Sequence, residues 1–217
     1  MYVPEHFAET DVPVLHGLIR SHPLGTWVAW VNGGLVANHL PFLVDPSRGR
    51  FGTLVGHVAR ANPVWHALVD TTPSVVVFQG PQKYITPSWY AAKMATGKVV
   101  PTWNYAVVHA HGSPRVTHDQ NWLRAHVSEL SDRHEQDKQV PWTIGDAPAE
   151  YIGALLNAIV GIEIPLDSIQ GKWKLAQNRS VADIAGTIAG LTAQGDDEAI
   201  ALAQLTREAA SKKLADK

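Results

Sequence analysis

Cysteine is absent from the 217-residue chain. Its absence excludes disulfide bridges, thiolate zinc sites and cysteine nucleophiles, and it leaves the redox compartment undetermined. No apolar run approaches the roughly 20 residues that a membrane-spanning helix needs. The first residues, MYVPEHFAETD, include acidic residues and a proline where a signal peptide would have a basic start and an apolar run. These features predict a cytoplasmic protein with no membrane partner.

An excess of basic residues is also lacking. The chain has 18 Lys and Arg against 20 Asp and Glu, a net charge of -2. A broad nucleic-acid-binding face normally shows as a Lys and Arg excess, and no helix-turn-helix with a basic recognition helix is visible. Direct DNA binding is therefore not supported, although a dimer could still assemble a basic groove from Arg48, Arg50 and Arg115.

Aromatic residues are distributed unevenly, with 8 Trp and 11 His against only 4 Phe. Trp and His combine a flat ring with a polar edge, so they suit half-buried ligand surfaces as well as cores. The sequence thus allows a site for a flat ligand.

The apolar patterns predict β-strands in the first half of the chain and helices in the second. Asn32-Gly33 separates two β-like runs and predicts a hairpin. From Asn121 the period becomes helical, and one late strand follows at 161–175. The expected strands lie at 26–31, 34–45, 51–60, 74–80, 100–112 and 161–175, and the expected helices at 12–22, 121–134, 147–160, 181–193 and 196–217. This order predicts an α+β fold with a mainly antiparallel sheet or small barrel.

Five segments place polar and aromatic residues inside otherwise structural stretches. They read NHLPFLVD, GHVARANP, YITPSWYAAK, VPTWNYAVVHAHG and GKWKLAQNRS. Arg and Lys bind phosphate, Trp and Tyr stack on flat rings, and Asn, Gln and Thr bond to polar ring edges. Together the segments suit a ligand with a flat aromatic ring and an anionic tail. No glycine-rich dinucleotide loop or P-loop is present, so no single segment is diagnostic.

Other site chemistries find little support. His109 and His111 point the same way on a strand, but two histidines supply at most half of a tetrahedral zinc site, and no carboxylate lies nearby in the sequence. No metal is therefore expected. A haem ligand among the histidines is equally unsupported. The chain lacks a G-x-S-x-G motif, which excludes a serine hydrolase of that type, and it lacks a pair of acid–base carboxylates.

The strand VPTWNYAVVHAHG has two different faces. One face carries small residues and begins with Thr102 and Asn104. The other carries Trp103, Tyr105 and the two histidines. We expect the small face to admit a flat ring, and the aromatic face to serve barrel packing or a dimer contact.

Five motifs, MYVPEHF, GHVARANPVW, GPQKYITPSWY, VPTWNYAVVHAHG and KWKLAQNRS, resemble the PaiB family of FMN-binding negative transcriptional regulators. They occur in the family's order from Met1 to about Asp183. The resemblance implies an FMN-binding split β-barrel with flanking and C-terminal helices, over residues 1–183, and a helical extension, 184–217, packed on the same domain. The sequence departs from the family at Thr86 and Ala176, where serine is usual.

The resemblance also implies the function and its site. The expected protein is a homodimer that binds FMN near the subunit interface and represses gene expression directly or indirectly. Arg60 and Lys93 are candidates for the flavin phosphate. The residues expected to flank the site or form its walls are His57, Ala59, Asn62, Tyr84, Ser88, Trp89, Tyr90, Thr102, Trp103 and Asn104. Gln177, Asn178 and Arg179 are expected to reach in from the neighbouring subunit.

Two alternatives remain open at this point. One is an FMN-dependent oxidoreductase, for which the sequence identifies no catalytic residue. The other is a haem-binding or haem-degrading split barrel, since related barrels can hold haem. The resemblance favours a regulator over an enzyme.

Overall fold

The computed structural model describes residues 1–215, with side chains up to residue 212. The last two residues of the predicted extension at 184–217 lie outside the described residues. The chain forms two compact units. The terminal unit comprises Met1–Leu18, Gln79–Val108 and Gln170–Lys217, and the central unit comprises Ile19–Phe78 and His109–Ile169.

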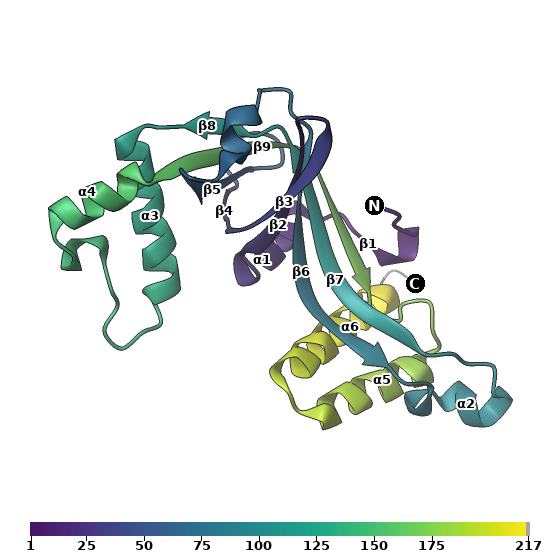
Figure 1. Cartoon of the computed structure of the whole chain (residues 1–217). Helices are drawn as coiled ribbons and strands as arrows, with labels where there is room; N and C mark the ends of the chain where they lie inside the picture. The colour runs from purple at the N-terminus through teal and green to yellow at the C-terminus, as the bar shows by residue number, and fades with distance from the viewer. Residues whose placement is uncertain (216–217) are drawn as a thin grey trace. The chain divides into compact units, whose positions relative to one another are not determined.

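The described residues contain one mainly antiparallel sheet of nine strands (Figure 1). Its order is β3-β2-β6-β7-β9-β5-β4, and β1 and β8 each pair with β9. The strands are β1 (Ala8–Glu9), β2 (Leu24–Val31), β3 (Gly34–Pro41), β4 (Leu43–Asp45), β5 (Thr53–Ala59), β6 (Ser74–Ile85), β7 (Thr102–Gly112), β8 (Arg115–Thr117) and β9 (Ile159–Lys174). The predicted α+β fold is confirmed.

Six α-helices accompany the sheet in the described part of the chain. They are α1 (Val12–Ser21), α2 (Ala91–Thr96), α3 (Gln120–Glu135), α4 (Ala149–Asn157), α5 (Val181–Gln194) and α6 (Asp197–Ala215). Several predicted boundaries are wrong. The strand expected at 34–45 is divided at Phe42 into β3 and β4, and the strand expected from residue 161 begins at Ile159. The helix expected at 147–160 ends at Asn157, because Ile159 and Val160 already pair with β5. The strand expected at 74–80 continues to Ile85.

The hairpin between β2 and β3 follows directly from its two turn residues. Asn32 and Gly33 have φ of 51° and 78°. Positive φ at both positions is the requirement of a type I′ turn, whose twist matches that of paired strands. The turn sets the register in which Leu24 faces Pro41 and Val31 faces Gly34.

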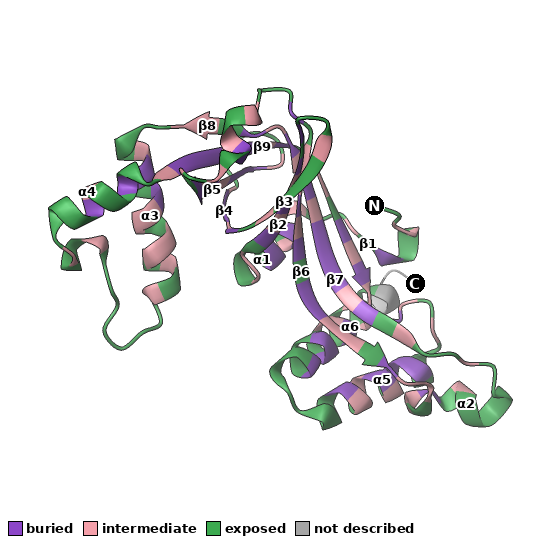
Figure 2. Ribbon diagram, viewed as in Figure 1, coloured by how far each residue is buried: buried purple, intermediate pink, exposed green. Residues whose placement is uncertain are grey.

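The core of the central unit is built from large apolar side chains of the sheet. Trp27, Phe42 and Phe78 are fully buried, and buried positions run along the strands of the sheet (Figure 2). The rings of Phe42 and Phe78 meet edge to face at 6.0 Å. A Cβ atom at Gly56 would lie 3.0 Å from the Phe42 ring, so a glycine leaves the space that this ring fills.

The terminal unit contains a helical pair, α5 and α6, that lie side by side (Figure 1). One face of α5 receives the aromatic ring of Trp89. Gly186 and Gly190 lie one turn apart on that face, and a Cβ atom at either position would collide with Trp89. The two glycines therefore let the segment around Trp89 approach the helix backbone closely.

This close approach predicts that Gly186→Ala destabilises the protein. The added methyl group would overlap the Trp89 main chain, and overpacking of this kind costs about 1–3 kcal/mol. Urea denaturation measures the change. Gly153→Ala in α4 is the control, because no atom lies within 4 Å of its added Cβ, and Ala is favoured over Gly in a helix by roughly 1 kcal/mol. Equal effects of the two substitutions would contradict the packing argument.

Candidate functional site

The segment Thr86–Gly97 holds several of the predicted site residues and is fixed against α5 within the terminal unit. The Thr86 hydroxyl accepts a hydrogen bond from the Ser88 amide at 3.3 Å and starts a short 3-10 helix, Pro87–Trp89. The carboxylate of Asp183, which is buried, accepts a hydrogen bond from the Ala92 amide at 3.0 Å. These bonds hold the loop in one conformation.

Trp89 and Tyr90 have packing partners inside this unit. The Trp89 ring lies on α5, and the Arg179 guanidinium lies 4.5 Å from the centroid of the Tyr90 ring. Burial raises the pKa of the Tyr90 hydroxyl, and the positive charge of Arg179 opposes that rise. Their role as a wall of the flavin site stays a prediction. Arg179 contacts Tyr90, which is another predicted site residue, but this contact is within one chain and not across a subunit interface.

Ser88 and Lys93 form a small group of hydrogen-bond donors at the surface. The Lys93 ammonium donates to the Ser88 hydroxyl at 3.0 Å, and both side chains are exposed. An ammonium and a hydroxyl held side by side on a fixed loop match the needs of a phosphate group. This pair is the arrangement in the terminal unit that best fits a flavin phosphate.

The two faces of β7 differ in how far they are buried. The small face is buried, with Asn104 only 1% exposed and Ala106 fully buried, so it is not open to a flat ring. The aromatic face is the exposed one. Trp103 is 53% exposed, and its ring meets Tyr84 edge to face at 6.4 Å. The expectation that the small face admits a flat ring does not fit this burial, whereas a dimer contact by the aromatic face stays a prediction. Period-2 alternation separates the faces but does not say which one the core covers.

Asn104 carries an unpaired donor. Its side-chain nitrogen is buried and has no hydrogen-bond partner among the described residues. A buried donor without a partner costs about 1–3 kcal/mol, which a ligand or water acceptor would offset. Thr102, two residues earlier, accepts a hydrogen bond from Lys174. The Asn104 donor lies on the covered face of β7, on the opposite side of the strand from the exposed ring of Trp103.

The turn after β9 is stabilised by Gln177. Its amide oxygen accepts from the Leu175 amide at 2.8 Å, and its amide nitrogen donates to the Trp173 carbonyl at 2.6 Å. The turn places Ala176 at φ 68°, a strained conformation for a residue with a Cβ. Both hydrogen-bonding ends of Gln177 thus serve the turn, whereas Asn178 is exposed. Whether either residue reaches a neighbouring subunit stays a prediction.

The remaining predicted residues lie in the central unit. Arg60 donates to the carbonyls of Asn157 at 2.6 Å and Ile159 at 2.9 Å, where α4 gives way to β9. Asn62 accepts from the Val64 amide and donates to Asn38 at 2.7 Å. Ala59 is exposed at the end of β5. Arg60 is therefore already bonded to main-chain carbonyls, and its role as a phosphate ligand stays a prediction.

His57 belongs to a buried pair of imidazoles that the sequence did not indicate. Its Nδ1 lies 3.1 Å from Nε2 of His126 on α3. His126 is 4% exposed, and its Nδ1 has no partner among the described residues. Burial, assisted by His57, lowers the pKa of His126 to about 4, and burial also lowers the pKa of His57. Both rings are therefore neutral near pH 7 and share one hydrogen bond.

Trp122 connects this pair to an ion pair on the same sheet. Its ring stacks on His126 at 5.3 Å, and its Nε1 donates to Glu163 at 3.0 Å. Glu163 also accepts from Arg48 at 2.6 Å, and this bond lowers the pKa of the carboxyl. A Cβ at Gly161 would collide with Trp122. The packing of α3 on the sheet thus depends on Gly161, on the ion pair between Arg48 and Glu163, and on the imidazole pair.

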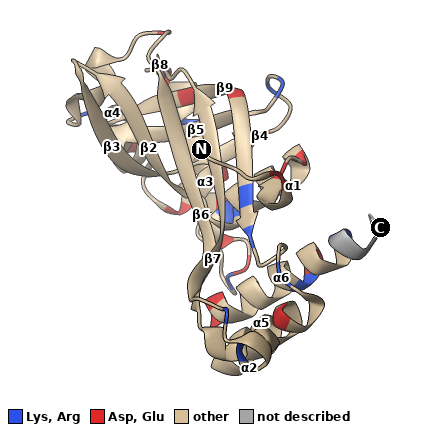
Figure 3. Ribbon diagram, turned by 90° about the vertical axis from the view of Figure 1, so that its right-hand side faces the viewer, with Lys and Arg blue, Asp and Glu red and all other residues tan. Residues whose placement is uncertain are grey.

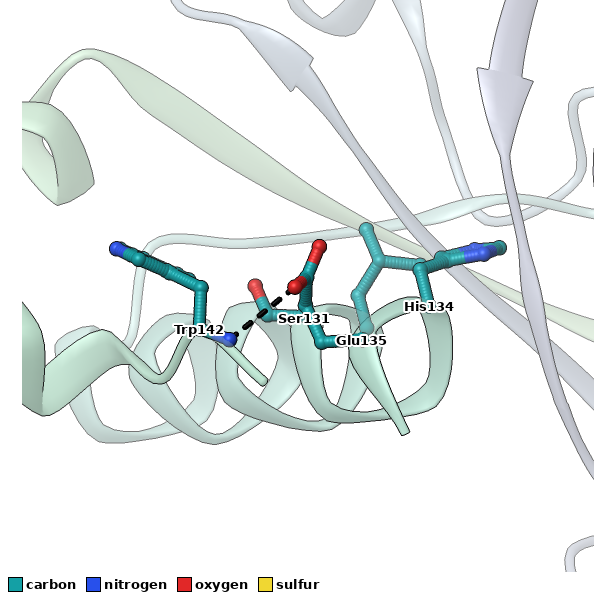
Figure 4. A pocket seen from close by; sticks show the side chains of 5 residues that line it. Ser131, His134, Glu135 and Trp142 are labelled. Atoms are coloured by element: carbon teal, nitrogen blue, oxygen red, sulfur yellow. Dashed lines mark hydrogen bonds between the residues drawn. The ribbon is translucent and has the colours of Figure 1, made fainter. Parts of the chain in front are cut away.

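A pocket of about 280 Å³ lies at the far end of α3 (Figure 4). Figure 4 shows Glu135 accepting a hydrogen bond from the Trp142 amide, at 3.1 Å. The residues that line the pocket are Leu130, Ser131, His134, Glu135 and Trp142. None of them is a predicted site residue.

The described residues contain no group of three His, Asp or Glu side chains arranged to hold a metal ion. His109 and His111 lie with their ring centroids 6.3 Å apart. None of the described helices is long and apolar enough to cross a membrane.

Comparison with solved structures shows that the chain shares its fold with a flavin-binding protein. An FAD- and heme-binding protein from Mycobacterium smegmatis matches 82% of this chain and 78% of its own, with a TM-score of 0.56 and 18% identity. At that identity the likeness shows the fold alone. The predicted split barrel is confirmed.

The chain belongs to the PaiB-type FMN-binding family, whose model, described as "Putative FMN-binding domain", matches residues 1–168. The Protease synthase and sporulation protein PAI 2 of Bacillus subtilis is 28% identical over 99% of this chain and 100% of its own. "Uncharacterized protein AN0679" of Emericella nidulans is 34% identical over 96% and 97%. The resemblance inferred from the five motifs is confirmed, and FMN is the cofactor of the family.

The residues of the terminal unit fit FMN. An exposed pair of aromatic rings, Tyr84 and Trp103, is available to contact a flavin ring. Ser88 with Lys93 fits a phosphate. FMN supplies redox chemistry when bound, and these side chains would supply contacts to its ring and tail.

The imidazole pair makes stability depend on pH. In the unfolded chain the pKa of His126 is about 6.5, whereas in the folded chain burial lowers the pKa to about 4. The stability contributed by the neutral ring is therefore complete above about pH 6.5 and is lost as the pH falls towards 4. At about pH 5 we expect a loss of about 2 kcal/mol relative to pH 7, measured by urea denaturation with tryptophan fluorescence.

His126→Gln tests the origin of this loss. Glutamine keeps a polar group near His57 but does not titrate in this range, so we expect lower stability at neutral pH and a flatter pH profile. His134→Gln, an exposed position on the same helix, is the matched control and retains the wild-type profile. A wild-type pH profile in His126→Gln would rule out the imidazole pair as the cause.

Proposed function

We propose that this protein is a homodimeric FMN-binding regulator of the PaiB type. In this proposal FMN lies near the subunit interface, and its bound state controls repression of gene expression. The family match over residues 1–168 carries the proposal. A relative named as a sporulation protein and aligned over nearly both whole chains supports a regulatory role.

The proposed flavin contacts lie in the terminal unit. Trp103 and Tyr84 contact the flavin ring, and Ser88 with Lys93 binds the phosphate. Exposure of two large aromatic rings supports the first contact. The hydrogen bond between Lys93 and Ser88 supports the last, because both donors are held ready on one loop.

The proposed repression is indirect. The chain carries a net charge of -2, and DNA-binding surfaces usually have a marked Lys and Arg excess. Of the three arginines that could form a basic groove in a dimer, Arg48 is paired with Glu163. A sequence-dependent retention of promoter DNA at moderate salt would contradict the indirect route.

The visible spectrum of the purified protein, with and without added FMN, tests the cofactor assignment. We expect the two absorption bands of an oxidised flavin and light scattering at twice 23.6 kDa. A protein that takes up no FMN contradicts the flavin function, and a flavin-bound monomer contradicts the dimer. An intense Soret band would favour a haem protein, and steady oxidation of NAD(P)H would favour an oxidoreductase.

Lys93→Gln tests the phosphate contact. Loss of one charged donor to phosphate is expected to weaken FMN binding about tenfold. Riboflavin has the same ring but no phosphate, so its affinity stays unchanged. Flavin fluorescence titration measures both. Lys98→Gln is the matched control, since Lys98 is exposed on the same loop. An equal loss of riboflavin and FMN binding would contradict a phosphate contact.

A further inference from the structure

Two lysines stand out on a part of the sheet that is otherwise poor in charge. Lys172 and Lys174 lie two residues apart near the end of β9, so their side chains share one face. β7, which provides the neighbouring aromatic residues, contains no Lys, Arg, Asp or Glu (Figure 3). Both lysines belong to the terminal unit.

A single aromatic ring lies under both ammonium groups. The Nζ atoms of Lys172 and Lys174 are 5.6 and 5.9 Å from the centroid of Tyr105. Lys172 is also 5.5 Å from the ring of Tyr2 and donates to the Tyr2 carbonyl at 3.1 Å. Lys174 donates to the Thr102 hydroxyl and to the Trp103 carbonyl. The two ammonium groups are thus held in fixed positions over one ring.

Neither lysine has an acidic partner in the part of the chain that the structure describes. The ion pairs among the described residues do not include Lys172 or Lys174. Glu9 lies on β1, which pairs with β9, but its carboxylate bonds to Lys212 at 3.1 Å. Burial lowers the pKa of Lys174, Tyr105 raises it, and the charges of Lys172 and Arg179 lower it further. The lysines therefore repel each other, and an anion would relieve the repulsion.

Two aromatic rings other than those assigned to the flavin lie beside the lysines. Tyr2 is 82% exposed, and Tyr105 is partly exposed. Rings of this kind contribute contact area to flat ligands, and cations beside them bind anionic groups. The combination of these two rings with two lysines that have no acidic partner among the described residues favours an anion carried on an aromatic ring.

We propose that Lys172, Lys174 and Tyr105 form a binding site for the carboxylate or phosphate group of a small aromatic ligand, separate from the phosphate contact of the flavin. The flavin phosphate has its own candidate donors in Ser88 and Lys93, on the loop after β6. The lysine pair on β9 is therefore available for a second anion. The site itself does not require the proposed regulatory function.

Phenyl phosphate is the probe, with benzyl alcohol as the neutral control, in ligand-observed NMR titrations of the full chain. We expect Lys174→Met and Lys172→Met each to weaken phenyl phosphate binding about tenfold. Lys174→Arg keeps the charge and retains binding. Lys98→Met, an exposed lysine, leaves it unchanged. Circular dichroism confirms that each variant is folded, and the Arg variant keeps the test valid if a Met variant is not.

FMN and riboflavin titrations of the same variants distinguish the two sources of an anion. The proposal requires that the ratio of FMN to riboflavin affinity stays unchanged in the β9 variants. A fall in that ratio would assign the lysines to the flavin phosphate and overturn the separate site. Undiminished phenyl phosphate binding in both Met variants, or no binding to the wild type, would also overturn it. Binding of the probe without binding of either flavin would contradict the flavin function alone.

Discussion

The pairing of β9 is the constraint on which the rest of the structure depends. This one strand pairs with β1, β5, β7 and β8, so four segments far apart in the sequence hydrogen-bond to it. It can do so because residues 159–174 alternate between buried apolar and more exposed polar side chains, with glycines where another group comes close. Gly161 leaves room for Trp122, and Gly171 leaves room for Leu15. A bulkier residue at either position would separate the strand from the element packed on it.

The polar residues of β9 also make electrostatic contacts, in addition to the strand pairing of the backbone. Glu163 links Arg48 and Trp122 in the central unit, and Trp122 in turn stacks on the imidazole pair. Lys172 and Lys174 face Tyr105 in the terminal unit. In the first group the charge of Glu163 is paired with Arg48, and the group acts on stability. The second group has no acidic partner among the described residues and is therefore the one suited to binding.

Much of the fold was predictable because its signals are local. Asn32-Gly33 specifies a turn because both residues readily adopt positive φ. Asn62 caps the 3-10 helix that begins at Pro63, and Gly97 ends α2. The candidate site was predictable only in part. Ser88 and Lys93 are five residues apart on one loop, so their contact is nearly local. The hydrogen bond between His57 and His126 joins residues 69 positions apart, and no sequence pattern predicts it.

The sequence by itself determined the element types, the α+β class and, through five ordered motifs, the FMN-binding family. Tertiary structure alone decided which face of β7 is covered, that Arg60 bonds to main-chain carbonyls, and that two lysines of β9 have no acidic partner. The physical reason is the range of the interactions. Turns, caps and periodicity depend on neighbours in the chain, whereas burial and charge pairing depend on neighbours in space.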